Sequence, residues 1–153
     1  MSARSALTAV AMLLAGLSHA STPTADAPDA SGRARVDIVV IHATKGAPSI
    51  DRELKPIAHY LESSFGTRFQ VFKQLGKNTL TVGKDQRVGH TLPNDSELFL
   101  TYLGAEGSLL RLLMEVSGLK TTVKVHDGGL FFQAGRTWKD GMLIVAVRAG
   151  MTR

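Results

Sequence analysis

The chain has 153 residues, a formal net charge of +5 and no cysteine. Disulfides, zinc–thiolate sites, iron–sulfur clusters and cysteine nucleophiles are therefore excluded, and the fold must be held together by its apolar core. The basic residues are spread along the chain without a stripe of stacking aromatics. This argues against nucleic-acid binding and favours solubility or a weak attraction to anionic surfaces.

Residues 1–20 have the features of a secretory signal peptide. Arg4 supplies positive charge, Ala6 to Leu17 forms an apolar core, and Ser18-His19-Ala20 offers small residues for cleavage. The apolar run is shorter than the roughly 20 residues of a membrane-spanning helix. We expect export to the periplasm or the exterior, with no transmembrane helix left after cleavage; an uncleaved anchor is the alternative.

Residues 21–35 are rich in Ala, Ser, Thr, Pro and Asp and carry almost no apolar bulk. Such a segment cannot bury enough surface to offset its ordering entropy, so it is predicted to be a disordered linker. The remaining residues, 36–150, have the usual length of a single domain.

The domain begins with a predicted strand and a predicted helix. Val36 to Ala43 is apolar on both faces, which is typical of a strand buried from both sides. Asp51 to Phe65 carries apolar residues at three- and four-residue intervals, so it is predicted to be an amphipathic helix capped by Ser49 or Asp51. Because Pro56 cannot donate a backbone hydrogen bond, an irregular first turn should precede the regular helix.

Short strands and turns follow the helix. Strands are predicted at Arg68–Leu75, Thr79–Val82, Val88–Leu92 and Glu97–Leu103, separated by turns at Gly76–Asn78, Gly83–Arg87 and Pro93–Asp95 and followed by a reversal at Gly104–Gly107. The strand at Thr79–Val82 is expected at an edge, where it leaves room for pairing with another chain.

Glu97 to Ala149 is predicted to supply most of the core as an antiparallel meander. A two-residue turn at Ser117-Gly118 would place Val116 opposite Leu119, and further pairs follow by counting outward. One face then pairs Met114 with Thr121, Leu112 with Val123 and Leu110 with Val125, and the other pairs Glu115 with Lys120, Leu113 with Thr122 and Arg111 with Lys124.

The meander is expected to continue through a turn at His126–Gly129. This turn would put Phe132 and Ala134 on the same side of the sheet as Val123 and Val125.

A bulge at Gly135 and a third hairpin at Asp140-Gly141 are predicted next. The last strand, Met142 to Ala149, is apolar on both faces and needs a central position or a second layer. The predicted fold class is thus α+β: an antiparallel meander packed with one amphipathic helix, preceded by a signal peptide.

No catalytic, cofactor or metal site is predicted. The histidines beyond the signal peptide lack neighbouring ligands at the spacing of a metal site. They are His42, His59, His90 and His126. The alternative of an enzyme that uses His42 or His126 needs three or more titratable side chains in one cleft.

The outward side of the meander carries aromatic and basic side chains together, a composition typical of protein contacts. The predicted interaction surface consists of Arg111, Leu113, Lys124, His126, Phe131 and Trp138. The alternative is that the helix covers this side of the sheet.

Two stretches carry a family resemblance: VDIVVIHAT near the start, and LKTTVKVHDGGLFFQAGRTWKDGMLIVAVRA over Leu119 to Ala149. With the helix between them, they resemble a group of uncharacterised exported bacterial proteins over nearly all of the mature chain, a resemblance that implies no functional residue. Thr121 to Ala134, with its Asp-Gly-Gly turn, is also similar to hairpins of secretins and their periplasmic partners. This local similarity implies a role in envelope machinery by analogy.

These observations predict a non-catalytic exported protein of the envelope or periplasm that acts through protein–protein contacts, as an accessory to secretion or envelope machinery. The alternative is a domain that binds a small ligand or a cell-wall polymer in a cleft between helix and sheet. A deep apolar pocket with a few converging polar groups would favour this alternative.

Overall fold

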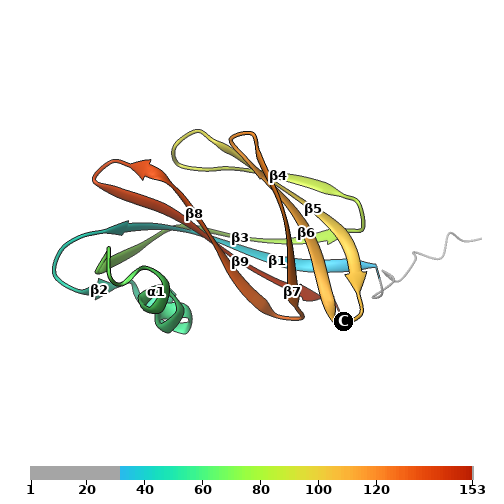
Figure 1. Ribbon diagram of the computed structural model, residues 1–153, viewed down its shortest axis with the longest axis horizontal. Coiled ribbons are helices and arrows are strands. Elements are labelled where there is room, and N and C mark those ends of the chain that lie inside the picture. Colours follow the sequence, from blue (N-terminus) through green and yellow to red (C-terminus); the bar gives the residue numbers. More distant parts are fainter. Residues whose placement is uncertain (1–31, 153) are drawn as a thin grey trace, which may run out of the picture.

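The computed structural model describes residues 32–152, which form two β-sheets and one helical segment (Figure 1). The predicted signal peptide and the predicted linker up to residue 31 lie outside the described residues. Within residues 32–152, no helix is long and apolar enough to cross a membrane.

The first sheet is five-stranded, in the order β2-β3-β1-β9-β8. Its strands are β1 (Arg33–Thr44), β2 (Ser49–Ile50), β3 (Val71–Gly83), β8 (Gly129–Trp138) and β9 (Gly141–Met151). The short strand β2 pairs with β3 in parallel, and the other pairs are antiparallel.

The second sheet is four-stranded and antiparallel, in the order β4-β5-β6-β7. Its strands are β4 (Arg87–Thr91), β5 (Glu97–Glu106), β6 (Leu109–Val116) and β7 (Leu119–His126). Between β2 and β3 the chain forms the 3₁₀ helix η1 (Arg52–Ile57) and the helix α1 (Ala58–Phe65).

The two sheets pack face to face and enclose the larger of two apolar cores. Its fully buried side chains include Val36 and Ile38 of β1, Val145 and Val147 of β9, Leu98 and Leu100 of β5, and Leu110 and Leu112 of β6. Alternating residues of each strand supply this core, as expected for sheets that interdigitate face to face.

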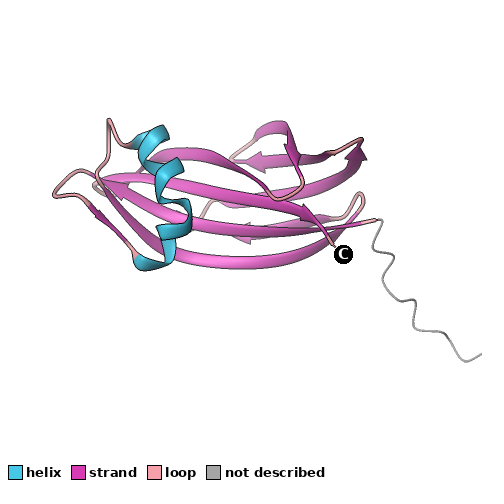
Figure 2. Ribbon diagram, turned by 90° about the horizontal axis from the view of Figure 1, so that it is seen from below, coloured by secondary structure: helices cyan, strands magenta, loops and turns pink. Residues whose placement is uncertain are grey.

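A second core lies between the opposite face of the first sheet and the helical segment. It contains Ile41, Ala43, Leu54, Leu61, Phe69, Phe72, Met142, Ile144 and Ala146. The helical segment crosses one half of this face, and the strands run on beyond it (Figure 2). β1 and β9 supply both cores, which confirms the prediction that the first and last strands are covered on both faces.

The helical segment begins as the sequence predicts, but its cap differs. Pro56 lies inside the irregular η1 turn, and the regular helix begins only at Ala58, as predicted. The predicted cap is wrong, because Asp51 makes no side-chain hydrogen bond to the helix. Its Oδ2 atom instead accepts a hydrogen bond from the backbone N–H of Gln74, 2.8 Å away, and so ties the helix start to β3.

The predicted β6–β7 hairpin is confirmed in every pair. Leu112 lies opposite Val123, and Val116 lies opposite Leu119. The turn residues have φ angles of 49° at Ser117 and 81° at Gly118, as a primed two-residue turn requires.

The predicted fold class is wrong, because the meander does not continue past this hairpin. β7 belongs to the second sheet and β8 to the first, where β8 pairs with β9. The segment from Thr121 to Ala134 is therefore not a hairpin, and residues 32–152 form a mostly-β sandwich with one short helical segment on its outside.

The link after β7 is bound to β9, which explains the crossing. The backbone N–H of Gly128 donates to the carbonyl oxygen of Ala149 at 2.8 Å. The backbone N–H of Met151 donates to Oδ1 of Asp127, also at 2.8 Å. Phe132 consequently packs against the helix-side core, whereas Val123 packs between the sheets.

Two smaller boundaries also differ from the prediction. β1 begins at Arg33, so the last residues of the predicted linker are strand. The predicted turn at Gly76–Asn78 is absent, because these residues pair with β1 inside β3; a bulge at Leu75 precedes them, since Val40 lies opposite Gly76 and Ile41 opposite Gln74. A glycine within an apolar strand signals a bulge as readily as a turn.

The third predicted hairpin is present, with its turn shifted by one residue to Lys139-Asp140. Trp138 lies opposite Gly141. The predicted bulge at Gly135 is confirmed by the register shift between Ala134 and Thr137.

Candidate strand-docking edge

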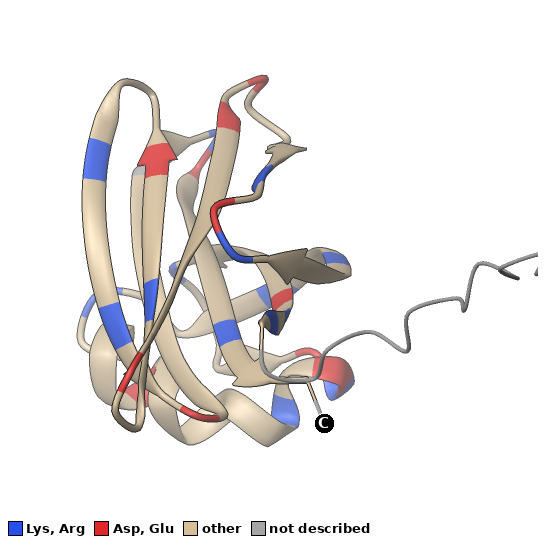
Figure 3. Ribbon diagram, turned by 90° about the vertical axis from the view of Figure 1, so that its right-hand side faces the viewer, with Lys and Arg blue, Asp and Glu red and all other residues tan. Residues whose placement is uncertain are grey.

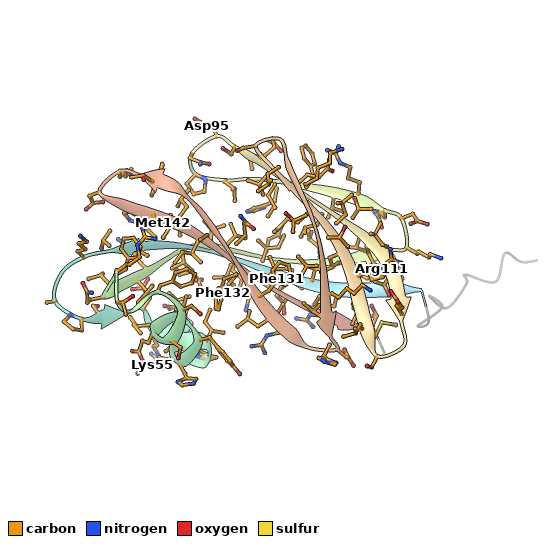
Figure 4. The ribbon with its side chains drawn as sticks, in the orientation of Figure 1. Lys55, Asp95, Arg111, Phe131, Phe132 and Met142 are labelled. Atoms are coloured by element: carbon orange, nitrogen blue, oxygen red, sulfur yellow. The ribbon has the colours of Figure 1, made fainter. Side chains whose placement is uncertain are left out.

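The structure divides the predicted interaction surface between two places. Arg111, Leu113, Lys124 and His126 lie on β6 and β7 and share the outer face of the second sheet. Phe131 and Trp138 belong to β8 and pack against the core between the sheets. Figure 4 shows Phe131 on a different part of the molecule from Arg111. The six residues therefore do not form one surface.

Ion pairs occupy the outer face of the second sheet. Glu115 pairs with Lys120 at 3.1 Å and with Arg87 at 3.0 Å. Glu106 forms ion pairs with Lys124 at 3.1 Å and with Arg111 at 3.8 Å. Each carboxylate thus joins strands by holding two cations.

These contacts set the electrostatics of that face. Hydrogen bonds from Lys120 and Arg87 hold the pKa of the Glu115 carboxyl below its ordinary value of 4.5. The Arg87 guanidinium also lies 3.6 Å from the centre of the Phe99 ring. Lys and Arg residues are interspersed with Asp and Glu along the ribbon (Figure 3). The charged side chains on this face therefore pair with one another across the strands, which is typical of a solvated sheet face.

The histidines are not gathered into a reactive site. His42 lies on β1, with Nε2 3.4 Å from Oδ1 of Asp140 and its ring edge-on to Trp138 at 5.0 Å between centroids. His126 lies in the other sheet, opposite Leu109. In the part of the chain that the structure describes, no group of three or more His, Asp or Glu side chains could hold a metal ion.

The edge strand β8 has a composition unlike the other sheet edges. Within the described residues, the hydrogen-bonded neighbour of β8 is β9 alone. From Gly129 to Gly135 the strand carries no charged residue, and Gln133 is the one polar side chain in this stretch. Its second row of backbone N–H and C=O groups is therefore accompanied by apolar side chains.

The other edges carry the features that usually prevent strands from pairing. β7 has Lys120 and Lys124, and β3 has Lys73, Lys77 and a bulge. β4 is only 5 residues long and begins with Arg87. Lysines, bulges and short length all discourage edge-to-edge association. β8 has its bulge near its end, at Gly135, and leaves the preceding stretch unprotected.

An apolar cavity of about 220 Å³ opens between the two sheets beside β8. Its walls include Leu92, Val116, Leu143 and Val145. Leu119 also lines it and is 60% exposed, so the apolar surface continues from the cavity to solvent. This cavity is called the inter-sheet slot below.

Gly135 shapes the junction of the edge and the slot. A Cβ atom at this position would lie 2.7 Å from the carbonyl oxygen of Leu143, so a larger residue would push β8 away from β9. The bulge turns the end of β8 beside the slot, because a bulge bends its strand and increases the local twist.

Such an edge can bind a further strand. Unpaired main-chain groups supply hydrogen bonds to an extended peptide, and pockets beside the edge accept alternate side chains of that peptide. The slot can accept apolar side chains on one face, and Phe132 with Phe65, whose rings lie edge-on at 5.6 Å, offers an apolar surface on the other.

Comparisons with protein families, curated proteins and solved structures find no match to this chain. The resemblance to exported bacterial proteins stays a prediction from the sequence, so the functional proposal rests on the chain's own geometry. Sequence reasoning placed β8 inside a meander and missed its position at an edge. The sequence feature that could have indicated this edge is the absence of charged residues from Gly129 to Gly135.

Proposed function

We propose that this protein is a non-catalytic, exported binding protein that captures an extended segment of another envelope protein by adding it to β8. The single observation that carries this proposal is the uncharged edge of β8 beside the inter-sheet slot. Main-chain hydrogen bonds would supply affinity, and the slot would supply specificity.

The chemistry of the edge defines the partner segment. It is extended, contains apolar residues at alternate positions, and carries no charge where it faces Leu130 to Ala134. A charge there would lose water without meeting an opposite charge, which is costly. Charged residues fit better outside the paired stretch.

Export is part of the proposal and rests on the sequence of residues 1–20. The absence of cysteine is compatible with an oxidising compartment, because the two apolar cores hold the fold without disulfides. A role beside secretion or envelope machinery follows from the same expectation.

A peptide selection with matched variants tests the proposal. Random peptides as long as β8, 10 residues, are selected against the full chain, and amide hydrogen exchange locates the bound peptide. We expect protection of β8 amides and an enrichment of alternating apolar residues.

Two lysine substitutions separate edge pairing from a general charge effect. Ala134→Lys adds a charge to β8, whereas Thr122→Lys adds the same charge to the edge strand of the other sheet. We expect Ala134→Lys to weaken peptide binding about tenfold or more and Thr122→Lys to leave it unchanged. Protection at β3 or β4, or equal effects of both variants, would contradict the proposal.

A further inference from the structure

A second cavity lies on the opposite side of the first sheet, away from β8's slot. It has a volume of about 400 Å³ and opens between η1 and the first sheet. The helical segment covers only part of this sheet face (Figure 2). Its volume falls within the range of about 300–1,000 Å³ that is usual for small-molecule sites.

The floor and one wall of this cleft are apolar. Val39 and Ala146 lie opposite one another on β1 and β9 and form part of the floor, together with Leu130 of β8. Leu54 and Ile57 line it from η1. The small Ala146 side chain leaves room under η1 that a larger residue would fill.

Cations lie beside this floor. Lys77 lies opposite Val39 on β3, and Arg148 lies two residues beyond Ala146 on β9. Both line the cleft, both are exposed, and neither forms an ion pair among the described residues.

The carboxylates of the cleft do not cancel both cations. Asp37 is already engaged, since Thr79 Oγ1 donates to its Oδ1 at 2.6 Å and Arg35 Nε lies 3.6 Å from the same oxygen. Glu53 lines the facing wall and offsets one charge. The lining therefore holds two cations and two carboxylates, and the excess of one positive charge beside the apolar floor comes from Arg35, which pairs with Asp37.

We infer that this cleft binds a small amphiphile with an apolar body and one anionic group, a carboxylate or a phosphate ester. The apolar body would lie on Val39, Leu130 and Ala146. The anion would lie between Arg148, whose guanidinium matches carboxylate and phosphate oxygens, and Lys77. This site shares Leu130 with β8 but lies on the opposite face of the first sheet from the inter-sheet slot, and it does not depend on the proposed capture of a strand.

Matched probes test the chemistry of the ligand. The full ¹⁵N-labelled chain is titrated with decanoate, decyl phosphate, decanol and decylamine, below their micellar concentrations, while amide chemical shifts are followed. We expect saturable shifts at Val39, Leu130 and Ala146 with the two anions, and affinities about tenfold weaker with decanol. Comparison of the two anions decides between a carboxylate and a phosphate ligand.

Variants test the assigned residues. Arg148→Gln should weaken decanoate binding about fivefold to tenfold, because a charge-assisted contact is lost. Ala146→Val should weaken all four probes by filling the floor, and Lys120→Gln, on the outer face of the other sheet, is the matched charge control. Since Arg148 is exposed, Arg148→Gln should fold normally, which intact amide shifts elsewhere would verify.

Three results would overturn the inference: no saturable shifts with either anion, binding of decylamine as tight as that of decanoate, or unchanged decanoate affinity in Arg148→Gln. Ala134→Lys should not alter decanoate binding, so failure of the amphiphile site and failure of strand capture can be told apart.

Discussion

β7 and β8 follow one another in the chain and are both edge strands, yet their edges differ in chemistry. β7 carries Lys120 and Lys124, which pair with Glu115 and Glu106. β8 carries no charge from Gly129 to Gly135 and borders the inter-sheet slot. One edge is thus closed by its own side chains, whereas the other keeps its main chain accessible to a further strand.

The bulge of β8 offers the largest expected effect. Gly135→Val should lower the free energy of unfolding by about 1–3 kcal/mol, because its Cβ would meet the carbonyl oxygen of Leu143. Urea unfolding measures the loss, and Ala134→Val, at the exposed neighbouring position, is the control. Equal stability of Gly135→Val and the wild type would show that the bulge does not hold β8 in place.

A substitution in the link between β7 and β8 should have the next largest effect on the free energy of unfolding. Asp127→Ala removes the acceptor for the Met151 N–H and should cost about 1 kcal/mol. Urea unfolding checks this value against Glu62→Ala, a substitution on the exposed side of α1. If both variants unfold alike, the side chain of Asp127 is not what fixes the crossing between sheets.

The ion pairs behind β7 predict a pH dependence. Since the pKa of Glu115 is lowered in the folded protein, its contribution to stability is present above its unfolded value, near 4.5, and is lost as pH falls through the lower folded value. Glu115→Gln should therefore reduce the fall in unfolding free energy on acidification below that pH. Parallel urea titrations of Glu62→Gln should retain the wild-type fall.

Ala134→Lys should have the smallest effect on stability. Because Ala134 is exposed, we expect a change below about 0.5 kcal/mol. The same variant should nevertheless reduce any self-association of concentrated protein, measured by light scattering, since a lysine blocks the uncharged edge. Thr122→Lys should leave self-association as it is, and a reduction by both variants would indicate a general charge effect.

Much of the local structure could be predicted because side-chain patterns decide it. Ser117-Gly118 fixed the β6–β7 register, since a slip of one residue would exchange the two faces of the hairpin. The apolar faces of β9 predicted burial on both sides. Pro56 predicted the irregular start of the helical segment.

The sheet partners of β8 could not be predicted in this way. Asp127-Gly128 makes a turn in either topology, and the contacts that direct the crossing come from Ala149 and Met151, far along the chain. Leu130, Phe131 and Phe132 are all apolar, so no alternation of apolar and polar residues shows which of them faces which side of the sheet. The same limitation hid the candidate edge and separated Phe131 and Trp138 from the predicted surface.

The two apolar cores share strands but no side chains, which has a consequence for how the molecule opens. Detachment of η1 and α1 would expose the smaller core and leave the packing between the sheets intact. Amides of α1 should then exchange with solvent sooner than those of β6, as in other proteins that unfold in parts. Because η1 is also a wall of the amphiphile cleft, such partial opening would admit a ligand longer than the closed cleft can hold.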